Sequence, residues 1–196
     1  MDIVQRVRSI LLKPKEEWVK IKAEPTTVAG LFTSYIMILA AIPAAFQFLG
    51  NVLVGQRLPL VGVFRWSIGR ALGNAVVTYI LALVGVYLFA LVVNELAPTF
   101  SSTKSMTSAL KLTAYSMTPG WVAGVLFVVP GLWALSLVAS LYGLFILYLG
   151  FDTPMMGTPK DKILGYMILS IVVIVVLTVV FGWIGGGIFA VRYGRL

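Results

Sequence analysis

Long apolar blocks separated by short polar segments make up most of this sequence. Within the blocks, apolar residues do not alternate with polar ones as in a half-buried strand. They run continuously for about the 20 residues that a helix needs to cross a bilayer. The pattern therefore predicts membrane-spanning helices at approximately residues 28–54, 71–96, 112–129, 132–150 and 163–190. The fold class that follows is an all-α integral membrane protein, a bundle of five transmembrane helices.

The segment before the first span, residues 1–27, has an amphipathic pattern of its own. Ile3 and Val7 are spaced as on one face of a helix, and Pro14 suits the first position of a second short helix. Because the segment is also basic and carries Trp18, we predict that it lies on the headgroup surface. The alternative is a solvated leader that only supplies positive charge.

The five spans form one membrane domain, residues 28–190, followed by a short basic tail, residues 191–196. Prolines predict irregular helices within it. We expect a kink at Pro43 in the first span and a bend at Pro119, because proline disfavours helical geometry at the residue before it. The segment 55–70 is too short and too charged to cross the membrane, so we predict an interfacial loop or a re-entrant piece there.

Charge sets the predicted orientation. The chain carries 15 Lys and Arg against 7 Asp and Glu, and the basic residues stand at the ends of the apolar blocks. With five spans, the side opposite the N-terminus holds only five of the 15 basic residues: Arg57, Arg65, Arg70, Arg192 and Arg195. The positive-inside rule therefore places the N-terminus in the cytoplasm and the C-terminus outside. The predicted location of the protein is the cytoplasmic (inner) membrane. Nucleic-acid binding is disfavoured, because no long Lys/Arg block occurs.

The residue types exclude several kinds of chemistry. The chain has no cysteine and no histidine, so disulfides and thiolate or imidazole metal sites are impossible. A Ser-Lys dyad would need Lys104 or Lys111 to be buried, and both stand in a polar connector where burial is not expected. We therefore predict no catalytic residue, no metal and no cofactor, and a protein that is not an enzyme.

Two carboxylates, Glu95 and Asp152, stand close to the apolar blocks, each at a predicted span end. Charged groups inside a membrane often mark ion or substrate pathways, so the pair is a candidate polar site on the cytoplasmic face. The simpler interpretation, which we favour, is that both are interfacial residues.

Two further features concern partners. Trp18 in the N-terminal segment and the pair Met155 and Met156 in a connector are candidates for a partner-binding surface, because methionine suits adaptable surfaces. Gly182 and Gly186 have the four-residue spacing that lets helices approach closely. That spacing favours either packing within the chain or a homo-oligomer.

The order of these pieces resembles the Yip family, membrane proteins named for interaction with Ypt/Rab small GTPases, and specifically its bacterial branch. Four short stretches carry the resemblance: PKEEW from Pro14, AYSMTP from Ala114, Tyr142-Gly143 and Leu149-Gly150. The resemblance implies five spans, a cytoplasmic N-terminus and no known enzymatic chemistry. It marks three motif positions without a role: Tyr115, Ser116 and Pro119. The sequence lacks the long N-terminal region of eukaryotic members, so their trafficking role is not transferred.

The best interpretation is a non-enzymatic scaffold or adaptor in membrane organisation. Its partners would be the lipid bilayer and a protein bound at the cytoplasmic face. The alternative is a small transporter or lipid-handling protein with a site near the proline-bent third span. The scarcity of charge inside the apolar blocks argues against that alternative.

Overall fold

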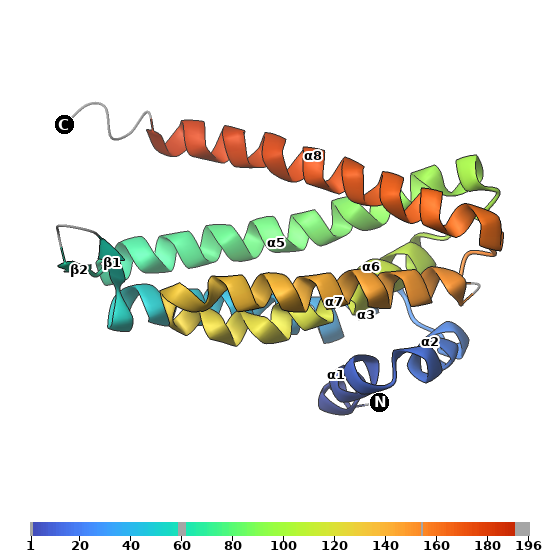
Figure 1. Ribbon diagram of the computed structural model, residues 1–196, viewed down its shortest axis with the longest axis horizontal. Helices are drawn as coiled ribbons and strands as arrows, with labels where there is room; N and C mark the ends of the chain where they lie inside the picture. The colour runs from blue at the N-terminus through green and yellow to red at the C-terminus, as the bar shows by residue number, and fades with distance from the viewer. Residues whose placement is uncertain (1, 59–61, 154, 191–196) are drawn as a thin grey trace.

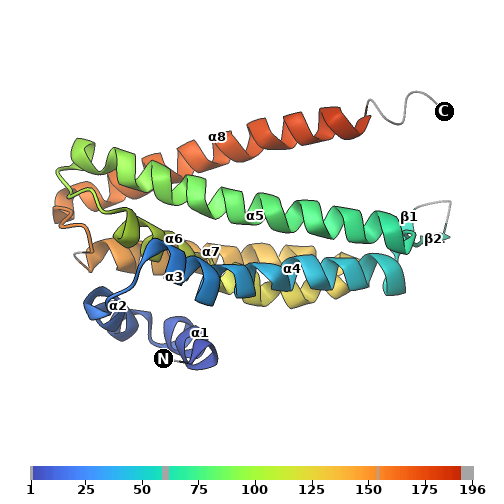
Figure 2. The same ribbon diagram turned by 180° about the vertical axis from the view of Figure 1, so that it is seen from behind.

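The structure is a computed structural model that describes residues 2–58, 62–153 and 155–190 (Figure 1). Long helices run side by side along one axis, with a short helix pair against one end and a hairpin at the other (Figures 1 and 2). The main helices are α1 (Ile3–Leu12), α2 (Pro14–Ala23), α3 (Val28–Leu31), α4 (Met37–Leu49), α5 (Ile68–Leu96), α6 (Met106–Ala123), α7 (Trp133–Asp152) and α8 (Ile163–Ala190). The tail, residues 191–196, lies outside the described residues.

The N-terminal segment folds into a pair of short helices that pack against the long ones, α1 on α6 and α2 on α7. Pro14 opens α2, where its missing N–H costs nothing. Glu16 and Glu17 lie in the first turn of α2 and Lys20 and Lys22 in its last turn, which is the charge distribution that the helix dipole favours.

The first long helical segment, Val28–Val54, combines α3, α4 and two π-helical turns at Phe32–Ile36 and Gly50–Val54. The Thr27 side chain accepts a hydrogen bond from the Gly30 amide and so caps its N-terminus. Pro43 lies inside α4 and packs against the start of the 3₁₀ helix Gly124–Val128, which follows α6, and a Cβ on Gly124 would be 2.6 Å from the proline ring. Proline inside this helix is tolerated because a neighbouring helix packs on it.

The segment after it forms an antiparallel hairpin in which β1 (Gln56–Leu58) pairs with β2 (Gly62–Phe64). Gly55 precedes the hairpin at φ 77°, a conformation that a side chain disfavours. A small hairpin at the end of the bundle therefore stands where we expected an interfacial or re-entrant piece (Figure 1).

The helix α6 runs without interruption from Met106 to Ala123, so Thr118 keeps helical geometry although Pro119 follows it, and the bend expected there stays a prediction. Pro119 is buried within it, close to α7, where a Cβ on Gly143 would be 4.0 Å from the proline Cδ and 2.5 Å from the Ser116 carbonyl oxygen. Close packing on α7 holds the helical geometry that proline alone disfavours.

Apolar side chains cover the outside of the bundle. Large exposed residues on the outward faces of the long helices include Ile80, Leu81, Val138, Leu141, Val172 and Val175. Soluble proteins rarely expose contiguous apolar surfaces of this extent. Three helical segments of the described chain are long and apolar enough to cross a membrane: Val28–Val54, Ile68–Phe100 and Ala134–Asp152. The structure thus has the surface of a membrane protein, and five crossings and their orientation stay predictions.

Candidate functional site: a buried ionic cluster under the N-terminal helix pair

Trp18 holds the N-terminal helix pair against the long helices. Its side chain is 0% exposed, and its indole N–H donates to the Ile146 carbonyl oxygen on α7 at 3.0 Å. Its ring lies edge-on to Tyr115 of α6, with 6.0 Å between ring centroids. A face of α2 that the sequence predicts to be a lipid or partner contact is therefore part of the protein core.

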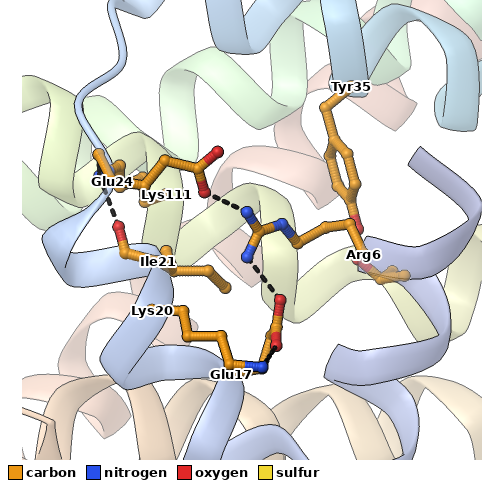
Figure 3. Close-up of polar contacts among 8 residues, drawn as sticks. Arg6, Glu17, Lys20, Ile21, Glu24, Tyr35 and Lys111 are labelled. Carbon is orange, nitrogen blue, oxygen red and sulfur yellow. Dashed lines mark hydrogen bonds and ion pairs between the residues drawn. The ribbon is translucent and has the colours of Figure 1, made fainter. Parts of the chain in front are cut away.

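Arg6 and Glu17 form an ion pair inside this interface. Nη1 of Arg6 donates to Oε1 of Glu17 at 2.5 Å, and both side chains are buried. The other Arg6 terminal nitrogen pairs with the Glu24 carboxylate, and Lys20 pairs with Glu17 at 3.2 Å (Figure 3). The Arg6 guanidinium also lies 5.7 Å from the centre of the Tyr115 ring. Its charge is thus balanced by two carboxylates and an aromatic face.

Lys111 joins the cluster from α6. Its ammonium donates to the carbonyl oxygens of Ile21 and Glu24, each at 2.7 Å, and so binds carbonyl groups at the end of α2 that have no partner within the helix. Burial lowers the pKa of this ammonium group, which precedes the expected third span, and the Glu24 carboxylate opposes the shift. Lys111 is 6% exposed, so the expectation that it would be solvated is wrong. No serine hydroxyl contacts its amine among the described residues.

We call these five residues, Arg6, Glu17, Lys20, Glu24 and Lys111, the Arg6 cluster. Beside it lies a pocket of about 140 Å³, which we call the Arg6 pocket. Its walls are Ile3, Arg6, Glu24, Thr26, Leu31, Ser34, Tyr35, Lys111 and Tyr115. The walls come from α1, the end of α2, the start of the first long helix and α6, so the pocket exists only while the N-terminal pair is docked.

The motif positions fall on the buried part of α6. Tyr115 lines the Arg6 pocket and packs against Tyr35, with 4.7 Å between ring centroids and the two rings tilted by 56°. The Tyr35 and Thr118 hydroxyl groups form a hydrogen bond at 2.8 Å. The Ser116 hydroxyl is buried without a hydrogen-bond partner among the described residues. Tyr115 and Pro119 thus support packing in this structure, and only Tyr115 reaches the pocket.

The expected partner surface is not exposed at two of its three positions. Trp18 is fully buried and Met156 is 3% exposed, since Met156 belongs to the core and its sulfur lies 3.9 Å from the Tyr166 hydroxyl. Met155 is half-buried against the same core. These apolar side chains find their partners inside the chain.

The two carboxylates of the candidate polar site, Glu95 and Asp152, do not form a shared site with a further polar group in the described structure. Glu95 is exposed, pairs with Lys104 and accepts a hydrogen bond from Asn94. Asp152 is exposed at the end of α7, and its carboxylate forms no hydrogen bond or ion pair with another described residue. Within the described ranges no group of three acidic side chains is arranged to hold a metal ion.

The predictions did not include the Arg6 cluster, although the sequence holds a signal for it. Glu17 lies on the same face of α2 as Trp18 and Ile21, so a carboxylate shares the buried stripe. A charged residue on an apolar stripe predicts a buried partner. Its buried partner, Arg6, is brought in by the docking of α1, and Lys111 reaches the carbonyl groups at the end of α2 from α6, which no local pattern reveals.

The fold and its apolar exterior define the class as an all-α integral membrane protein. The sequence model of the Yip1 domain matches residues 8–184, so the chain belongs to the Yip1 family. It is 25% identical over 150 residues to inner membrane protein YohC of Escherichia coli strain K12, over 75% of this chain and 77% of YohC. YohC of E. coli O6:H1 strain CFT073 matches equally well. No solved structure matches the chain. The comparisons confirm the predicted family and the predicted location in the inner membrane.

Proposed function

We propose that the protein is a non-enzymatic adaptor of the inner membrane, which presents its N-terminal helix pair to a protein partner at the cytoplasmic face. The observation that carries the proposal is the docking of this pair by Trp18 and the Arg6 cluster. A buried ionic cluster specifies one arrangement more than it adds stability. The pair is thereby held as a rigid surface instead of a flexible leader.

The outer face of the pair has the composition of a contact surface. Val4, Leu12 and Val19 are 62–69% exposed. The same stretch of the chain carries five exposed basic residues: Arg8, Lys13, Lys15, Lys20 and Lys22. Asp2 and Glu16 are the exposed acidic residues of the same stretch, so the face carries a positive charge. Such a face suits a partner with acidic and apolar residues.

Two groups that the sequence offered for chemistry, Glu95 and Lys111, have partners within the described chain. Glu95 pairs with Lys104 at the surface, and Lys111 donates two hydrogen bonds to main-chain carbonyl groups. No observation favours the alternative of a transporter at the third span, because Pro119 itself packs close to α7. The proposed adaptor surface is therefore the exposed face of α1 and α2 and not the two methionines.

The experiment is site-specific photo-crosslinking in cells, with the photoreactive amino acid at Val19. An adaptor gives one discrete crosslinked protein at this position. Met156 is the control, because its buried side chain should crosslink only within the chain. Recovery of lipid alone from Val19, with no protein adduct, would contradict the adaptor proposal.

Gly182 and Gly186 lie near the end of α8, where the structure describes the helix but not the surroundings of these residues. Self-association through them stays a proposal. Its support is their spacing, which suits close helix contact.

A further inference from the structure

The Arg6 pocket has more hydrogen-bond donors than its walls use. Arg6 has five N–H groups, of which the two ion pairs engage one on each terminal nitrogen. Lys111 has three and donates two to main-chain carbonyl groups. The Tyr115 hydroxyl has no hydrogen-bond partner among the described residues. A ligand that fills this pocket must therefore accept hydrogen bonds.

The net charge of the Arg6 cluster indicates that the ligand is an anion. Three cations, Arg6, Lys20 and Lys111, face two carboxylates, Glu17 and Glu24, so the described cluster has a net charge of +1. Glu17 is fully buried, whereas the Glu24 side chain is 40% exposed. Glu24 can therefore turn toward solvent and leave an Arg6 nitrogen to an anion, while Glu17 keeps Arg6 in place.

The volume of the Arg6 pocket and its position along the helices limit which anion can bind. A volume of about 140 Å³ corresponds to about five water molecules at about 30 Å³ each, which is room for a group of about five heavy atoms. Leu31, Ser34 and Tyr35 line the pocket from the start of the first apolar segment, and Lys111 directly precedes the apolar part of α6. In a bilayer that these apolar segments cross, the pocket lies where phospholipid phosphates meet the hydrocarbon core, and basic pockets between helices at that level bind lipid headgroups.

We propose that the Arg6 pocket is a phosphate-binding site, with Arg6, Lys111 and Tyr115 as hydrogen-bond donors to the phosphate oxygens. The phosphate belongs to a phospholipid headgroup or is free inorganic phosphate. Both present the same anionic oxygens, and the experiment distinguishes them. The site is independent of the adaptor function, because binding a phosphate requires no protein partner.

Glu24→Gln gives a test in which binding improves. The substitution removes the carboxylate that competes with the ligand for Arg6, so phosphate affinity should rise about tenfold. Glu16→Gln is the matched control, since it makes the same charge change on an exposed side chain of α2 that does not line the pocket. A purely structural role of Glu24 predicts no gain.

Tyr115→Phe tests whether the Tyr115 hydroxyl group donates a hydrogen bond to the phosphate. It removes a hydroxyl group that has no partner in the described protein, so the fold should persist while phosphate affinity falls about tenfold. Tyr148→Phe is its control, because Tyr148 is exposed on α7 and does not line the pocket.

The measurement is native mass spectrometry of the detergent-purified full chain, titrated with phosphatidylglycerol, with diacylglycerol and with inorganic phosphate. Binding of phosphatidylglycerol but not diacylglycerol, stronger in Glu24→Gln and weaker in Tyr115→Phe, identifies a lipid headgroup site. The same variant pattern with inorganic phosphate alone identifies a free phosphate site. Equal binding of both lipids, or equal affinities across all four variants, overturns the proposal.

Discussion

The ring of Trp18 lies so close to Gly150 that a Cβ on this glycine would be 2.7 Å from the ring carbon Cζ2. The same Cβ would meet Leu112 at 2.6 Å, so α2, α6 and α7 meet at a position that has room for no side chain. One helical turn earlier, Ile146 accepts the indole hydrogen bond. The docking of the N-terminal pair thus depends on a glycine 132 residues away in the sequence (150 − 18).

Gly150→Ala should weaken this docking. Over-packing at a close contact costs about 1–3 kcal/mol, which exceeds the gain of up to about 1 kcal/mol that alanine brings to a helix. The measurement is thermal unfolding in detergent together with proteolysis of the N-terminal pair. Gly85→Ala is the control, because a Cβ there meets nothing within 4 Å, and it should not destabilise the protein. Equal effects of the two substitutions would contradict the packing argument.

Glu17→Gln should release the N-terminal pair by a different route. It leaves the buried Arg6 with only the partly exposed Glu24 carboxylate, and breaking a buried ion pair costs about 3 kcal/mol or more. We expect faster hydrogen exchange in residues 3–23 and little change elsewhere. Glu16→Gln changes the charge equally at an exposed position, paired with Lys13 at 3.9 Å, and should have no measurable effect.

If exchange in residues 3–23 stays at the wild-type rate in Glu17→Gln, the ion pair does not hold the docked state. A double substitution of Arg6 and Glu17 by methionine then serves as a second check. Apolar replacement of a complete buried pair is often neutral, so this variant should be more stable than Glu17→Gln.

The helices could be predicted from the sequence because apolar blocks of membrane length leave few alternatives. The first segment was predicted as 28–54, and the structure has one helical segment at Val28–Val54. Local signals also gave the start of α2 at Pro14. The close approach of Pro119 to Gly143 of α7 could not be predicted, because it depends on how two helices pack. The hairpin at Gln56–Leu58 and Gly62–Phe64 was also missed, since its strands are three residues each.

The site depended on contacts that no local pattern encodes. Trp18 suggested an interfacial anchor by type alone, but its partner is a main-chain carbonyl 128 residues away. Lys111 stood in a polar connector, and only the end of α2 explains its burial. The resemblance to the Yip family marked Tyr115, which lies where α2 and α6 meet. Gly143 and Gly150 belong to stretches that carried the resemblance, and in the structure both lie where helices approach closely.

The hydrogen bond between Tyr35 and Thr118 should be measurable as a coupling energy. The two hydroxyl groups are 2.8 Å apart in the core, between the first long helix and α6. Hydrogen bonds between membrane helices contribute about 0.6 kcal/mol on average and up to about 1.7. We expect a coupling near 1 kcal/mol in a double-mutant cycle of Tyr35→Phe and Thr118→Val, followed by unfolding in detergent. Strictly additive effects would show that the contact does not stabilise the fold.

The orientation of the chain can be tested directly, because it has no cysteine and any single introduced thiol reports its own side of the membrane. Loops rich in basic residues stay in the cytoplasm, so the N-terminal pair should lie inside and the hairpin outside. A membrane-impermeant maleimide should label Arg65→Cys in spheroplasts, but label Lys22→Cys and Thr103→Cys only after permeabilisation. All three positions are exposed in the structure, so burial does not limit labelling.

The two inner positions test the number of crossings as well as the orientation. Lys22 precedes the first long helical segment, and Thr103 follows α5, so two helices separate them and both must face the same side if each helix crosses once. Labelling of Lys22→Cys but not Arg65→Cys in spheroplasts would reverse the orientation. Labelling of Lys22→Cys and Thr103→Cys from opposite sides would mean that one of the two helices does not cross. The Arg6 pocket would face the cytoplasmic leaflet only in the predicted orientation, because its walls include α1 and the end of α2, and this helix pair lies away from the hairpin end of the bundle (Figure 1).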